Sequence, residues 1–84
     1  MAKEENSPED LTYLLGNMGI EILSAIDKGA KDFFTIKLFS GIPLSCIKGR
    51  IPVLLDLELI KKIDDDYILT EKGFNFKKRL EDRS

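Results

Sequence analysis

Histidine, glutamine and tryptophan are absent from this 84-residue chain, and cysteine occurs once, at Cys46. Histidine is the commonest general base and metal ligand, so its absence removes the usual means of acid–base catalysis and transition-metal binding. A single cysteine excludes an intramolecular disulfide and any Cys-x-x-Cys metal site. The glycine-rich motifs of hydrolases and nucleotide-binding enzymes are missing as well. We therefore expect no enzymatic activity, no metal and no other cofactor.

Long apolar runs are also lacking. No stretch approaches the roughly 18 apolar residues that a membrane-spanning helix needs, and residues 1–10 are polar and acidic, unlike a signal peptide. These features predict a cytoplasmic protein without membrane contact. The length fits one domain, for which we expect a flexible start over residues 1–7 and a folded unit over residues 8–83. A chain this short buries only about 60–65% of its unfolded surface, which makes oligomerisation an early expectation.

Charge is distributed unevenly along the chain. The net charge is −2, which argues against non-specific binding of nucleic acid. Residues 1–27 and 51–67 are acidic, whereas residues 28–50 are basic. The basic window contains Lys28, Lys31, Lys37, Lys48 and Arg50 against Asp32 alone.

The first long helix is expected from Pro8 to the Lys28-Gly29 pair. Ser7 is a candidate N-cap, and proline suits the first helical position. Gly16 and Gly19 interrupt the pattern, and they permit close packing or mark a break near residues 16–19. Helical spacing relates the apolar residues Leu11, Leu14, Leu15, Met18, Ile22 and Ile26.

Two shorter helices are expected next, separated by Gly41, which tolerates the positive φ of a tight turn. Asp32 is a plausible N-cap of the first, with Thr35 as an alternative start. We expect Phe33, Ile36 and Phe39 to face inward from this helix. Pro43 fits the first turn of the next helix, over residues 43–57, in which Pro52 should cause a bend. The inward series of this helix is Ile47, Ile51, Leu54 and Leu57.

The last third of the chain predicts a hairpin followed by a helix. Residues 61–64 and 67–70 have the composition of short strands, joined at the turn-favouring Asp64-Asp65-Asp66 run. This run lacks the spacing of a calcium loop. Thr70 is a candidate cap of the final helix, whose apolar residues are Phe74, Phe76 and Leu80.

Three motifs in this order are similar to those of the winged helix-turn-helix transcriptional regulators of archaea and their viruses. Residues 40–43 read Ser-Gly-Ile-Pro, residues 57–60 read Leu-Glu-Leu-Ile, and residues 67–73 read Tyr-Ile-Leu-Thr-Glu-Lys-Gly. The resemblance covers roughly residues 20–80. It implies a mostly helical α+β fold of about four helices and a two-stranded wing, in which residues 43–57 form the recognition helix.

Two departures from the family pattern stand out. Glu58 occupies a place where the family usually has glycine. The expected wing tip carries three carboxylates where a wing that contacts DNA usually has Arg or Lys. Carboxylates near a phosphate backbone would repel it, so we expect the wing to be too short to touch DNA or to point away from it.

The resemblance implies binding of double-stranded DNA through the outer face of residues 43–57. Lys48 and Arg50 are candidates for guanine or phosphate contacts, and Ser45 for a phosphate or base edge. Gly49 permits close approach of a phosphate, or simply tight packing. For each lysine and arginine, ordinary solvation is the alternative, and Cys46 is more typical of a small core residue than of a redox switch. The full set of candidate DNA-binding residues is Leu44, Ser45, Lys48, Gly49, Arg50, Lys37 and Lys31.

Two functions remain open. The first is a transcriptional regulator that binds DNA as a homodimer, paired through its terminal helices. Ile20, Leu23 and Phe76 are expected to leave apolar area there for a second copy. The alternative is a winged-helix module that docks on a protein partner and binds no DNA itself. The acidic wing and the apolar Leu44, Val53 and Leu55 favour this alternative.

Overall fold

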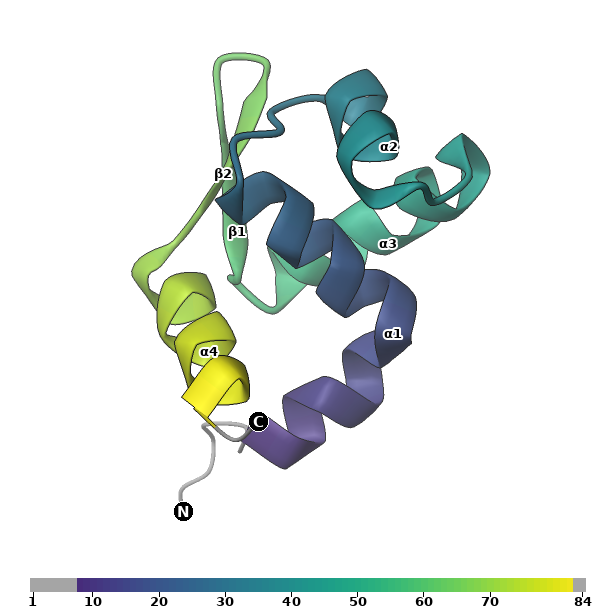
Figure 1. The fold of residues 1–84 in the computed structure, drawn as a ribbon. Helices are drawn as coiled ribbons and strands as arrows, with labels where there is room; N and C mark the ends of the chain where they lie inside the picture. The colour runs from purple at the N-terminus through teal and green to yellow at the C-terminus, as the bar shows by residue number, and fades with distance from the viewer. Residues whose placement is uncertain (1–7, 83–84) are drawn as a thin grey trace.

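The computed structural model describes residues 8–82. In this part of the chain, three helices are followed by an antiparallel hairpin and a fourth helix. The elements are α1 (Pro8–Asp27), α2 (Phe33–Ser40), α3 (Leu44–Asp56), β1 (Ile60–Ile63), β2 (Asp66–Leu69) and α4 (Glu71–Asp82), as Figure 1 shows. This order confirms the predicted mostly helical α+β fold and is compatible with a winged-helix layout. The expected Ser7 cap, the flexible start over residues 1–7 and the side chain of Leu11 lie outside the described residues.

Helix α1 is broken at Gly16. This glycine has φ 66° and ψ −179°, which is not helical, so two helical segments meet there. Gly19 permits close packing, which was the other predicted role, because a Cβ at this position would lie 2.8 Å from the Cβ of Leu15. The sequence left a break and a close contact open as alternatives and favoured one helix with a weak point, whereas the structure has a break at Gly16 and a close contact at Gly19.

The buried face of α1 differs from the predicted stripe. Leu14 and Met18, both expected on the inner stripe, are exposed, whereas Leu23, expected off that stripe, is buried. Leu14 precedes Gly16, so the non-helical conformation there changes its direction relative to the residues that follow. Met18 and Leu23 both follow Gly16, and the buried face of this segment is wider than one stripe, since Leu23 is buried together with Ile22 and Ile26.

Both ends of α2 are capped as the sequence predicts. The Asp32 carboxylate accepts a 2.8 Å hydrogen bond from the Thr35 N–H, and the Thr35 hydroxyl accepts one from the Asp32 N–H, which completes a capping box. At the other end Gly41 has φ 75° and donates its N–H to the Lys37 carbonyl. Pro43 lies just before α3 instead of in its first turn.

The inward face of α2 was only partly predicted. Ile36 is buried and Phe33 packs against Tyr67 with ring centroids 5.8 Å apart. Phe39 was expected to face inward and is 52% exposed instead. Because α2 spans only about two turns, Ile36 and its neighbours fill the space against the core, and Phe39 is left on the flank of the helix.

The hairpin pairs Ile60 with Leu69 and Ile63 with Asp66. Both strands begin and end one residue earlier than predicted, so Asp64 and Asp65 form a two-residue turn and Asp66 belongs to β2. On the opposite edge of β2, the Tyr67 N–H donates to the Lys31 carbonyl at 2.8 Å. This bond ties the hairpin, one residue pair from its turn, to the segment between α1 and α2.

Helix α3 continues through Pro52 and ends in a Schellman motif centred on Glu58. The N–H of Leu59 donates to the Leu54 carbonyl and that of Glu58 to the Leu55 carbonyl, each at 3.0 Å. Glu58 has φ 63°, a left-handed conformation that glycine adopts without strain. The position at which the sequence departs from the family pattern is thus one where the backbone itself favours glycine.

The start of α4 is attached to this same turn. The Thr70 hydroxyl donates to the Glu58 carbonyl at 2.6 Å and accepts from the Gly73 N–H at 3.0 Å, which confirms Thr70 as the cap of α4. The Lys72 ammonium donates to the Leu57 carbonyl at 2.8 Å. These bonds explain the Thr-x-x-Gly part of the motif at residues 67–73 as a structural device.

The other end of α4 packs beside α1. Phe76 is buried, Leu80 is half-buried against the core, and Phe74 is exposed. The ammonium of Lys77 lies 3.3 Å from the Asp27 carboxylate and also pairs with Glu81. The hydrogen bond to Glu81, followed by that to Asp27, raises the pKa of Lys77.

In the part of the chain that the structure describes, no single helix is long and apolar enough to cross a membrane. Only when α2 and α3 are taken together are they long and apolar enough for a membrane span, and they are bent by 109° at the turn between them.

Candidate nucleic-acid interface

The first two turns of α3 present an open outer face. Leu44, Ser45, Lys48 and Gly49 are all exposed, and a Cβ at Gly49 would meet nothing within 4 Å. The opposite face carries the buried residues Ile47, Ile51 and Leu54. The structure therefore brings four of the candidate DNA-binding residues together on one surface.

Arg50 does not share this surface. Successive residues of an α-helix are rotated by about 100°, so side chains two positions apart project about 160° from each other. Lys48 is exposed and Arg50 is half-buried, as this rotation leads one to expect. The sequence analysis paired these two side chains because both are cationic and close in sequence.

Lys31 and Lys37 lie outside α3 and carry exposed side chains. The backbone of Lys31 is fixed by two hydrogen bonds, from its N–H to the Thr35 hydroxyl at 2.9 Å and from the Tyr67 N–H to its carbonyl. Lys37 occupies the last turn of α2. The basic window thus places single exposed cations on three successive segments, Lys31 before α2, Lys37 in α2 and Lys48 in α3.

The wing has an acidic tip, and two lysines precede this tip in β1. Asp64 and Asp65 are exposed in the turn and Asp66 is half-buried. Both lysines of β1, Lys61 and Lys62, are exposed, and the Lys62 ammonium lies 5.8 Å from the centre of the Tyr67 ring. The sequence analysis considered the carboxylates alone. The Ile-Lys-Lys-Ile composition of β1 was the signal that lysines flank them.

Sequence reasoning also missed the apolar outer face of α2. Phe34 is 67% exposed and Leu38 is 63% exposed, and they lie one helical turn apart. The α2 sequence Phe-Phe-Thr-Ile-Lys-Leu-Phe-Ser has more apolar residues than one side of an eight-residue helix can bury. This excess of apolar residues is the signal that could have revealed the exposed face.

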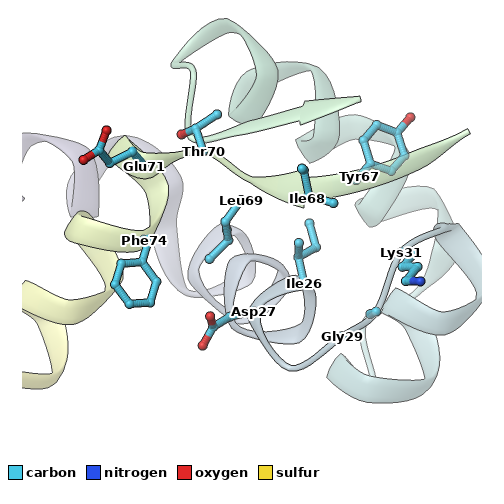
Figure 2. A pocket seen from close by; sticks show the side chains of 11 residues that line it. Ile26, Asp27, Gly29, Lys31, Tyr67, Ile68, Leu69, Thr70, Glu71 and Phe74 are labelled. Atoms are coloured by element: carbon cyan, nitrogen blue, oxygen red, sulfur yellow. The ribbon is translucent and has the colours of Figure 1, made fainter. Parts of the chain in front are cut away.

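A shallow hollow of about 420 Å³ lies away from the outer face of α3. Figure 2 shows it between the end of α1, strand β2 and the start of α4, with Phe74 at one end and Lys31 at the other. Its centre is apolar, and Asp27 and Glu71 add carboxylates near Phe74. Lys31 is the one candidate DNA-binding residue among those that line it.

Two kinds of reactive side chain remain, the cysteine and the possible metal ligands. Cys46 is half-buried and packs against the core, as expected for a structural cysteine. Within residues 8–82, no three histidine, cysteine or carboxylate side chains converge as metal ligands would. No protein-family model matches the sequence, and a search of curated proteins finds no significant match.

Proposed function

We propose that this protein is a transcriptional regulator that binds double-stranded DNA by placing the first two turns of α3 in the major groove. The observation that carries the proposal is the exposed surface of Leu44, Ser45, Lys48 and Gly49 on the second helix of a helix-turn-helix. In proteins of this architecture, the N-terminal residues of that helix contact base edges.

The side chains on this surface suit distinct contacts. The Lys48 ammonium donates to guanine O6 and N7 or to a phosphate, and the Ser45 hydroxyl to a phosphate or base edge. Leu44 suits contact with a thymine methyl group, and Gly49 leaves room for the DNA backbone. The exposed ammonium groups of Lys31 and Lys37 contribute phosphate contacts that fix the register without reading sequence.

A homodimer acting in the cytoplasm is part of the proposal, because paired recognition helices match a two-fold operator. Two residues expected to cover the dimer contact, Leu23 and Phe76, are buried in the core of the chain itself. Tyr13, Met18 and Phe74 are exposed on the terminal helices and take their place in the proposed contact.

A protein-docking module without DNA binding is the second candidate. The exposed Phe34, Leu38 and Phe39 of α2 favour it, because contiguous apolar surface is typical of protein contacts. The acidic pI of 5.1 favours it as well.

A salt-dependent titration separates the two. Duplexes enriched from a random library by the full chain would be titrated by fluorescence anisotropy at several salt concentrations. We expect a specific duplex to emerge and its affinity to fall steeply with salt, because phosphate contacts release counterions. Lys48→Gln should lower the magnitude of the log–log slope by about 1.

The matched control is Lys78→Gln, which removes an exposed lysine of α4 and leaves the α3 surface intact. It should bind like the unmodified chain. Failure to enrich any sequence at low salt would contradict the DNA-binding proposal and favour the docking module.

A further inference from the structure

The outer face of α2 carries both apolar and basic groups. Phe34, Lys37 and Leu38 lie on one side of the helix, all exposed, and the exposed Lys31 precedes it. The carboxylate that precedes the helix, Asp32, is held by the Thr35 N–H and hydroxyl in the capping box. This face therefore suits a partner surface that is apolar and acidic.

The wing tip of the same chain has that chemistry. Ile63 is 48% exposed at the end of β1, and the carboxylates of Asp64, Asp65 and Asp66 follow it directly. An apolar side chain beside three acids is the complement of apolar side chains beside two lysines.

Both surfaces lie at the same end of the molecule, as the hairpin tip and α2 show in Figure 1. A two-fold axis near that end would bring the tip of each protomer onto α2 of the other, so both contacts would form at once. We propose that a second copy of this chain covers the α2 face, with Ile63 against Phe34 and Leu38 and the tip carboxylates beside Lys31 and Lys37.

This contact is weak and electrostatic. It joins two short elements, so we expect it to bury less than the roughly 800 Å² per partner of a standard stable interface. Its charges are exposed, so salt screens them. It also occupies the lysines assigned to phosphates. On the proposed DNA-binding function, this contact and DNA binding therefore exclude each other, because the tip carboxylates take the place of phosphates. The homodimer through the terminal helices leaves these lysines free and is compatible with DNA binding.

Charge reversal tests the contact without DNA. The wing variant is Asp65→Lys with Asp66→Lys, which leaves Asp64 in its left-handed conformation, and the helix variant is Lys31→Glu with Lys37→Glu. Sedimentation equilibrium of the full chain at tens to hundreds of micromolar would measure association at low and high salt. We expect the association constant of the unmodified chain to fall at least tenfold at high salt, and that of each variant to be at least tenfold lower at low salt.

The decisive sample is an equimolar mixture of the two variants. Each then offers the charge that the other lacks, so association should return to within about threefold of the unmodified chain. Glu21→Lys and Lys78→Glu, at exposed positions of α1 and α4, are the charge controls and should change nothing. Circular dichroism confirms that each variant is folded.

Association that is insensitive to salt and to both reversals, or a mixture that does not recover, would overturn the proposal. The homodimer of the proposed function pairs through the terminal helices by apolar contacts, so it would persist under these conditions and would account for such association. Because no DNA is present, this result is independent of the titration that tests DNA binding.

Discussion

The carbonyl oxygen of Leu59 occupies the space that a side chain at residue 73 would need. A Cβ added to Gly73 would lie 2.0 Å from that oxygen, well inside any permitted contact. The first turn of α4 is thus seated directly on the segment that follows α3, and the Thr70 and Lys72 hydrogen bonds hold it there.

Gly73→Ala should destabilise the protein by about 1–3 kcal/mol, the usual cost of overpacking, because backbone must move to admit the methyl group. Gly49→Ala is the matched control, since Gly49 lies inside α3 in open space. It should raise stability by up to about 1 kcal/mol through helix propensity. Urea denaturation of both variants checks the contrast, and equal effects would contradict the packing argument.

Glu58→Gly should stabilise the protein by about 1 kcal/mol, because a left-handed residue other than glycine costs about 1–2 kcal/mol. In a domain of this size, that gain corresponds to a rise in Tm of roughly 4–8 °C. Glu58→Ala keeps the strained conformation and should show no such gain. A calorimetric Tm for the glycine variant at or below that of the alanine variant would refute the strain.

The stability contributed by Asp32 should depend on pH. The Thr35 N–H, and then the Thr35 hydroxyl, hold the pKa of the Asp32 carboxyl below its usual value of 3.8 in the folded state. Its contribution is therefore present above that value and is lost as the pH falls through the lower, folded-state pKa.

Asp32→Asn keeps a capping oxygen but does not titrate. The stability difference between the two proteins should be constant near neutral pH and should change in the acid range, in the direction of a loss for the unmodified chain. Urea midpoints measured between about pH 2.5 and 6 would show this. A difference that is the same at every pH would argue against the hydrogen-bonded carboxylate.

Lys48→Glu should weaken DNA binding at least tenfold, because it places a carboxylate on the outer face of α3. Arg50→Glu should change affinity by less than threefold, since Arg50 projects from a different side of the helix. The double variant should then resemble Lys48→Glu alone. Gel-shift titrations of the folded variants would decide, and a larger effect at Arg50 would relocate the binding surface.

Replacing Asp64, Asp65 and Asp66 by Asn should alter DNA affinity by less than about threefold at nanomolar protein, the scale of a screened long-range term. Asn keeps the turn chemistry, including the left-handed conformation of Asp64. Fluorescence anisotropy provides the measurement. A gain of about tenfold or more, with a steeper salt slope, would place the wing at the DNA interface.

Features fixed by local chemistry could be predicted from the sequence. The Asp32 cap, the Gly41 turn and the Thr70 cap each depend on a few neighbouring residues, and all three are found where expected. The order of helices and strands followed from the same signals. On α3, the buried Ile47, Ile51 and Leu54 followed from the apolar series and the family pattern, whereas Leu57, also in that series, is half-buried and lies beyond the end of the helix.

Features fixed by tertiary packing could not be predicted in this way. Whether Gly16 continues a helix or breaks it depends on what its flanking segments pack against. The exposure of Met18 and the burial of Leu23 likewise depend on which side of α1 the rest of the chain covers. The prediction that Phe39 faces inward was wrong for a similar reason, because an eight-residue helix has more than one plausible inner face. DNA binding itself stays a prediction, since fold alone does not imply it.

The bond from the Tyr67 N–H to the Lys31 carbonyl holds the hairpin one residue pair before its turn, while Asp64 and Asp65 project beyond it at the free end. Only a short tip of the wing therefore extends past this attachment. Residues at the free end are consequently under little demand from folding, so insertions and replacements there should be accepted readily. In descendants of this sequence, the tip is where new binding preferences could arise without a change to the scaffold.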